Sequence, residues 1–232
     1  MTTWALIPAR GGSKGIKRKN LQKINGKTLL EIAIENAKKS NQFEKIFVSS
    51  EDKEILGLAS ELGANTHKRD HSLAQDDSTT ESVFKDFLSG IHNEKLPELI
   101  ACCECTSPFI KNEHFLKVIE QLKTHPELNS CMTVCEVDHT AHAYNQRFID
   151  RDFINFVFPF QRSGTRRQTK PAFYKFGNLV VARVGHLMGG NSFFSGNVGY
   201  VKIPKLYSVN IDEEDDLVLA DALSRTVFNK RN

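Results

Sequence analysis

A glycine-rich loop that carries five basic residues follows directly after the first apolar stretch of the sequence. It spans residues 9–20 and reads ARGGSKGIKRKN. Glycines let the backbone approach phosphate oxygens and direct N–H groups at them. Arg10 offers a planar pair of donors for two oxygens, whereas Lys14 and Lys19 act as point charges on flexible stems. Because a loop that only turned the chain would not need this charge, the composition predicts a polyphosphate-binding loop.

The spacing of the glycines distinguishes this glycine loop from two common phosphate-binding motifs. It contains neither the G-x-x-x-x-G-K-[ST] of a P-loop nor G-x-G-x-x-G followed by the acidic residue that binds a ribose. An NAD-dependent oxidoreductase is therefore disfavoured. Lys17 and Arg18 fit a solvated face better than a ligand site.

Apolar runs that alternate with helical patterns position the glycine loop. They predict strands at 4–8, 45–49, 98–103, 131–137, 177–184 and 199–203, and helices at 28–40, 53–62, 82–91, 112–122 and from about 212. This alternation is typical of right-handed βαβ units, so we expect an α/β fold with a doubly wound, mostly parallel sheet. Ligands of such sheets bind at the carboxyl ends of the strands, where the glycine loop begins.

The alternation stops between about residues 138 and 175. Short aromatic-rich pieces lie there among polar residues, for example FINFVF at 153–158. Exposed aromatic side chains on a small insertion suit a contact between subunits. We therefore expect a single domain over residues 1–232, with a dimerisation insert at about 138–175, and a homodimer.

Composition excludes several classes of protein. The 31 Lys and Arg residues exceed the 28 Asp and Glu residues by only three, so the overall charge gives no reason to expect a nucleic-acid partner. No apolar run is long enough for a membrane span, and the first residues lack a signal-peptide pattern, so we expect a cytoplasmic protein without a membrane partner. The five cysteines sit in or beside apolar runs and predict buried free thiols rather than a zinc site.

Further sequence blocks follow the glycine loop in a fixed order. They are NGKTLL at 25–30, VSSED at 48–52, Arg69 with LA at 73–74 and Asp76, TSP at 106–108, RRQ at 166–168 and NID at 210–212. Together with IPARGGSKG and KNL in the opening stretch, these blocks resemble the CMP-sialic acid synthetase (acylneuraminate cytidylyltransferase) family over nearly the whole chain. The resemblance implies a Rossmann-like nucleotidyltransferase. In the reaction that the family catalyses, an acidic sugar's anomeric hydroxyl attacks the α-phosphorus of CTP, and pyrophosphate departs.

The resemblance also implies roles for single residues. The implied catalytic residues are Arg10, Lys14, Lys19 and Asp212. The implied nucleotide-binding residues are Arg10, Gly11, Gly12, Ser13, Lys14 and Lys19 for the triphosphate, and Asn20, Arg69, Ser78 and Thr80 for the base and ribose. The implied sugar-binding residues are Glu104, Arg166, Arg167, Gln168, Phe193 and Phe194. Without the resemblance, the two phenylalanines would be assigned to the core.

Asp212 and Asn210 are the candidate metal ligands. Mg²⁺ prefers oxygen ligands and commonly bridges substrate phosphates, so Mg²⁺ is the expected cofactor, with Mn²⁺ as an alternative. Residues two apart on a strand point the same way, so both side chains could face one ion. The family usually has Asp-x-Asp here. The other interpretation makes Asp212 the N-cap of a helix with an acidic first turn.

Several departures from the family pattern leave the substrate open. Glu104 replaces a glutamine, Val180 replaces a tyrosine, and FGN at 176–178 replaces the family's Asn-Gly. Sialic, legionaminic and pseudaminic acids and an amino-substituted octulosonic acid all remain candidates. A guanylyltransferase of the same fold and a non-catalytic nucleotide-binding protein are the alternative functions. The general base is unassigned, with a metal-bound water or a nearby carboxylate as the options.

Overall fold

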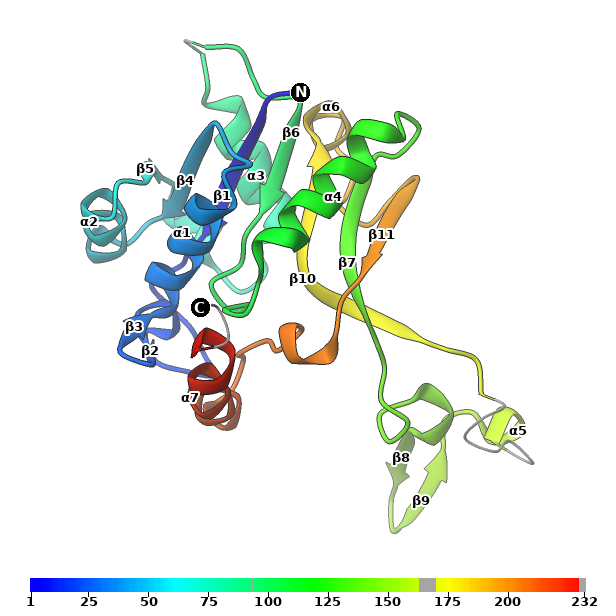
Figure 1. The fold of residues 1–232 in the computed structure, drawn as a ribbon. Coiled ribbons are helices and arrows are strands. Elements are labelled where there is room, and N and C mark those ends of the chain that lie inside the picture. The colour runs from blue at the N-terminus through cyan, green and yellow to red at the C-terminus, as the bar shows by residue number, and fades with distance from the viewer. Residues whose placement is uncertain (93, 163–169, 230–232) are drawn as a thin grey trace.

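A seven-stranded, mostly parallel sheet forms the centre of the computed structural model, which describes residues 1–92, 94–162 and 170–229 (Figure 1). Its strands, in spatial order, are β11 (Val198–Lys202), β7 (Ser130–Glu136), β10 (Tyr174–Arg183), β6 (Leu99–Cys102), β1 (Thr3–Pro8), β4 (Lys45–Ser50) and β5 (Asn65–Lys68). Only β10 runs antiparallel to its neighbours in this sheet. The predicted doubly wound α/β fold is confirmed.

Helices cover both faces of the sheet. They are α1 (Leu29–Ser40), α2 (Lys53–Glu61), α3 (Thr80–Ser89), α4 (Asn112–Thr124), α6 (Val184–Met188) and α7 (Glu214–Asn229). Successive side chains of a strand point to opposite faces, and β1 shows the result. Ala5 and Ile7 pack with α1 and α4 on one face, whereas Trp4 and Leu6 pack with α3 and α6 on the other.

The remaining elements are short. A two-stranded hairpin of β2 (Lys23–Ile24) and β3 (Lys27–Thr28) follows the glycine loop, and 3-10 helices span Lys19–Leu21, His71–Ala74, Ala143–Asn145 and Lys205–Tyr207. Edge strand β5 was not predicted, because its sequence NTHK has no apolar run and most of it is exposed.

An arm projects from the sheet between β7 and β10 (Figure 1). It consists of a hairpin of β8 (Arg147–Asp150) and β9 (Phe153–Phe156), followed by α5 (Pro159–Arg162). Within β10 a bulge separates Phe176 from Val180, and the side chain of Thr133 accepts hydrogen bonds from the backbone N–H groups of Asn178 and Leu179 there. Bulges bend strands, which accounts for the course of β10 out of the sheet into the arm. The arm occupies the predicted insert, and its role in dimerisation stays a prediction.

All five cysteines are buried and none forms a disulfide. Burial raises the pKa of the Cys105 thiol to about 12 and that of Cys131 to about 12. Within the described part of the chain, no three Cys, His, Asp or Glu side chains form a group that could hold a metal ion. None of the helices described combines the length and the apolar character that a membrane crossing requires.

Candidate functional site

A pocket of about 250 Å³ lies at the carboxyl ends of β1 and β6, next to the first turn of α3. It brings together seven of the predicted site residues: Arg10, Lys19, Asn20, Arg69, Ser78, Thr80 and Glu104. Strands β1 and β6 are neighbouring parallel strands, so both end at the same edge of the sheet. A larger hollow of about 530 Å³ lies at the foot of the arm. We place the candidate site in the smaller pocket because the predicted site residues converge there, and none of those that the structure describes lines the larger hollow.

Two predicted phosphate ligands share one carboxylate at this pocket. The guanidinium of Arg10 lies 2.9 Å from Asp76, and the Lys14 ammonium lies 2.7 Å from the other oxygen of the same carboxylate. Hydrogen bonds hold the pKa of Asp76 below its usual value, and the one from Lys14 has a larger effect than the one from Arg10. An anionic group thus already sits against the side chains that we expect to bind phosphate oxygens.

On the expectation that the pocket binds CTP, the Asp76→Asn variant should bind it more tightly, because Arg10 and Lys14 would no longer have to break ion pairs with a carboxylate. Exposed ion pairs are weak, so the expected decrease in KM for CTP is about two- to fivefold. Initial rates at increasing CTP concentration measure it. The matched control is Asp77→Asn, which removes the same charge from the neighbouring residue. A raised KM in Asp76→Asn would instead make Asp76 a substrate ligand.

Lys19 joins the glycine loop to the segment before α7. Its ammonium donates to the carbonyl oxygen of Ile211 and to Asp212 Oδ1, both at 3.0 Å. Asn210 Nδ2 donates to the other Asp212 oxygen at 2.6 Å, so these two side chains face each other. The backbone N–H of Ile211 donates to Thr106, in the loop after β6, which fixes the segment beside the pocket.

Glu104 lies close enough to Asp212 and Lys19 to interact electrostatically with both. Burial raises the pKa of its carboxyl group, the charge of Asp212 raises it further, and Lys19 opposes the shift. Glu104 therefore belongs to the same electrostatic cluster as Lys19 and Asp212.

Residues 210–212 form no strand, which corrects the geometry expected for them. The side chains of Asn210 and Asp212 nevertheless meet in this irregular segment. The carboxylate that accepts the N–H groups of Asp212 and Glu213 is Asp216, at 3.0 Å from each. Asp212 therefore does not take the N-cap role that the alternative interpretation gave it, while the acidic first turn of α7 is present.

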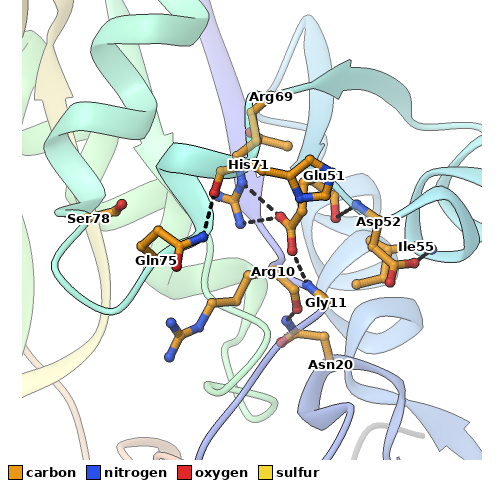
Figure 2. Close-up of polar contacts among 12 residues, drawn as sticks. Arg10, Gly11, Asn20, Glu51, Asp52, Ile55, Arg69, His71, Gln75 and Ser78 are labelled. Carbon is orange, nitrogen blue, oxygen red and sulfur yellow. Dashed lines mark hydrogen bonds and ion pairs between the residues drawn. The ribbon is translucent and has the colours of Figure 1, made fainter.

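The backbone of Gly11 has a protein partner. Its N–H donates to Glu51 Oε1 at 2.7 Å (Figure 2), and nucleotide binding by Gly11 stays a prediction. A Cβ at Gly11 would lie 2.6 Å from Asp52 Oδ2, and one at Gly15 would collide with the carbonyl oxygen of Asp212. Close packing thus requires both glycines. Gly12 has open space around it, and neither it nor Ser13 lines the pocket.

The residues expected around base and ribose already have protein partners. Asn20 donates to the carbonyl oxygen of Arg10 at 2.9 Å, and Ser78 donates to that of Ser72 at 2.7 Å. Arg69 is buried and its guanidinium binds Glu51 through two nitrogens, at 3.2 and 3.1 Å. Thr80 is the first residue of α3. The pocket brings all four together, and nucleotide binding by them stays a prediction.

Arg18 lies at the surface with its side chain 34 % exposed, but it is held by two carboxylates. It has a left-handed backbone conformation with φ 55°, and its guanidinium binds Asp52 at 2.7 Å and Glu54 at 2.6 Å. Asp52 is also the N-cap of α2, accepting from the N–H groups of Glu54 and Ile55. Burial by itself raises the pKa of Asp52, but the hydrogen bonds from Arg18 and the backbone bring it below its usual value. Arg18 and Asp52 lie 34 residues apart in the sequence, so local spacing gave no signal for this contact.

Among the predicted sugar ligands that the structure describes, Glu104 lines the pocket, whereas Phe193 and Phe194 do not. Phe193 is 1 % exposed and packs edge-on against Phe84 in the core, which is the alternative expected without the resemblance. Phe194 is exposed beside Phe176 and does not line the pocket. Arg166, Arg167 and Gln168 lie outside the described residues.

Comparison with known proteins gives the family. Residues 4–152 match the family described as cytidylyltransferase. This chain belongs to the cytidylyltransferase family. An N-acylneuraminate cytidylyltransferase of Streptococcus agalactiae serotype V is 26 % identical over 215 residues, which cover 92 % of this chain and 51 % of the relative. A pseudaminic acid cytidylyltransferase of Campylobacter jejuni is 34 % identical over 119 residues, covering 50 % of this chain and 51 % of the relative.

The predicted resemblance to CMP-sialic acid synthetases is thereby confirmed, and the chain spans about half the length of these curated relatives. Among solved structures, a CMP:2-keto-3-deoxy-manno-octonic acid synthetase complexed with CTP superposes with a TM-score of 0.76 at 14 % identity, covering 97 % of this chain and 99 % of the other. At that identity the likeness supports the cytidylyltransferase fold alone.

Proposed function

We propose that this chain is a Mg²⁺-dependent cytidylyltransferase that transfers CMP from CTP to an acidic 2-keto-3-deoxy sugar and releases pyrophosphate. The observation that carries the proposal is the convergence of Arg10 and Lys19 on one pocket at the carboxyl ends of the parallel strands, with the Asp212 carboxylate bound to Lys19. The relative that matches most of the chain is named for N-acylneuraminate, a sialic acid, and the one that matches half of it for pseudaminic acid. Both acids belong to this class of sugar.

The side chains at the pocket have different roles according to which part of CTP they would face. The sugar's anomeric hydroxyl attacks the α-phosphorus and loses its proton to an unassigned base. The bond from that phosphorus to the bridging oxygen of pyrophosphate breaks. Lys19, in the wall of the pocket, neutralises charge on the α-phosphate as it develops, whereas Arg10 and Lys14 neutralise the departing pyrophosphate. Little covalent chemistry is required of the protein, so orientation and charge supply most of the rate enhancement.

The donor set next to Lys19 fits Mg²⁺, with Mn²⁺ as an alternative. Asp212 offers a carboxylate and Asn210 a carbonyl oxygen, which are the ligand types that these hard cations prefer. The Lys19 ammonium already rests on Asp212 and the carbonyl oxygen of Ile211, so these oxygens attract a cation. Asn210 now donates its N–H to Asp212, and its amide would rotate to present oxygen. The ion, when bound, supplies positive charge and alignment for the phosphates.

A pyrophosphate-release assay tests the function. Purified protein is given CTP, Mg²⁺ and, in turn, sialic, legionaminic and pseudaminic acids, with and without EDTA. We expect release with at least one sugar, and loss of release in EDTA. Folded protein that releases none with any sugar contradicts the proposal. Tight CTP binding without turnover would identify a non-catalytic nucleotide-binding protein, and preference for GTP in competition would identify a guanylyltransferase.

We further propose that the arm binds a second copy of this chain. Ile149 and Ile154 face each other across the β8–β9 hairpin and are 78 % and 66 % exposed, and Phe160 on α5 is 90 % exposed. So much apolar surface on a projecting hairpin is typical of a subunit interface.

We expect the double variant Ile149→Asp with Ile154→Asp to convert a dimer to a monomer, because two buried charges would have no partners. Sedimentation equilibrium measures the change. Leu116→Asp, which places one charge on the exposed face of α4, is the control. A double variant with the oligomeric state of the native chain would refute the interface.

A further inference from the structure

Glu51 is a buried carboxylate that contacts the glycine loop and the pocket-lining Arg69 at once. It follows β4, and its side chain is 8 % exposed. One oxygen accepts the N–H of Gly11 at 2.7 Å, and the other accepts from Arg69 Nε and a terminal nitrogen of the same guanidinium (Figure 2). Glu51 thus links the glycine loop to the segment that runs from Arg69 to α3.

A carboxylate at this place has a cost for an enzyme that binds a triphosphate. Burying the charge requires desolvation, and the charge repels phosphate oxygens. Arg69 offsets the first cost, since its side chain is only 3 % exposed and it is bound through two nitrogens. It also offsets the second, because the pair is neutral as a whole. A guanidinium has five N–H donors, so Arg69 retains donors for a ligand in the pocket that it lines.

The residue after Glu51 holds the far end of the same loop. Asp52 binds the guanidinium of Arg18 and leaves no room for a side chain at Gly11. Adjacent residues at the carboxyl end of one strand therefore fix both the start and the end of the glycine loop. Such support keeps a charged loop in one conformation before the ligand arrives, which lowers the entropic cost of binding.

We infer that Glu51 is a positioning residue for the nucleotide. It orients Gly11, and with it the backbone that carries Arg10, and it holds Arg69 at the pocket wall. This inference rests on the proposed function. Glu51 does not touch the reacting atoms, so its removal should weaken CTP binding more than it slows the chemical step.

Two substitutions of Glu51 test the inference. Glu51→Ala removes both contacts, whereas Glu51→Gln keeps an acceptor for Gly11 and loses the charge that faces Arg69. A hydrogen bond to a charged group is strong, so we expect KM for CTP to rise about ten- to a hundredfold in Glu51→Ala and less in Glu51→Gln. KM for the sugar should change less than threefold. Glu113→Gln, an exposed acid-to-amide change on α4, serves as the matched control.

Calorimetric titration with CTP gives the same comparison without turnover. If the native chain binds CTP but releases no pyrophosphate, the proposed activity fails, and the variants still decide the inference through Kd. A lowered melting temperature with native KM and Kd for CTP in either folded variant would overturn it, since Glu51 would then only stabilise the fold. If Glu51→Ala does not fold, Glu51→Gln becomes the deciding variant, because glutamine has the size of glutamate but lacks its charge.

Discussion

With Asp212 as a ligand of the proposed Mg²⁺, the Asp212→Asn variant should lose at least about a hundredfold in kcat, because loss of a metal's charge stabilisation costs several kcal/mol in the transition state. The substitution keeps the shape of the side chain and removes its charge. Asp212 contacts both Lys19 and Asn210, so it is the anionic centre of the segment before α7. Pyrophosphate release at saturating CTP, measured over a range of Mg²⁺ concentrations, gives the effect.

Two further variants test whether the loss of kcat depends on the charge of Asp212 itself or on the negative charge of the surrounding segment. Asp215→Asn removes an exposed carboxylate from the first turn of α7 and should leave kcat within about twofold, because such a charge interacts weakly with the helix terminus. Adding Asn210→Asp to Asp212→Asn returns one carboxylate to the pair and should recover part of the lost rate. An Asp212→Asn enzyme with native kcat at every Mg²⁺ concentration would show that this carboxylate binds no catalytic ion.

The sequence predicted those parts of the fold that bury apolar surface. β1 was recognisable as a continuous apolar run, and α1 because its apolar residues follow the helix period. β5 was not, because an exposed edge strand needs no apolar side chains and its pairing with β4 is made by backbone groups. Periodicity reports burial rather than backbone pairing, so elements without buried faces escape it.

The candidate site shows a second limit of the same kind. The sequence motifs indicated Arg10, Lys19 and Asp212, and the structure brings these residues to one edge of the sheet. They did not indicate that Gly11 donates to Glu51, or that Arg18 is bound at the start of α2. Both contacts join segments that are far apart in the chain, and local spacing carries no information on such partners. Motifs therefore named the groups that can meet substrate more readily than the groups that support them.

Burial distinguishes the two lysines of the glycine loop and gives them different expected effects. The side chain of Lys19 is 16 % exposed and is held by Asp212 and Ile211, whereas that of Lys14 is 81 % exposed at the rim. A fixed charge in a partly desolvated place stabilises a transition state without reorganisation, whereas a mobile surface charge mainly attracts the ligand. Lys19 should therefore act on kcat, and Lys14 on KM for CTP.

We expect Lys19→Met to lower kcat by about a hundred- to a thousandfold, the range found when one charge-stabilising donor is removed from an active site. Methionine keeps the apolar stem that fills the wall, so the change isolates the ammonium. Lys14→Met should raise KM for CTP by no more than about tenfold and leave kcat nearly native, since exposed charges contribute little. Initial-rate measurements over CTP and sugar concentrations separate the two constants. Equal losses of kcat in both variants would mean that position in the loop, not burial, determines which lysine meets the reacting phosphate.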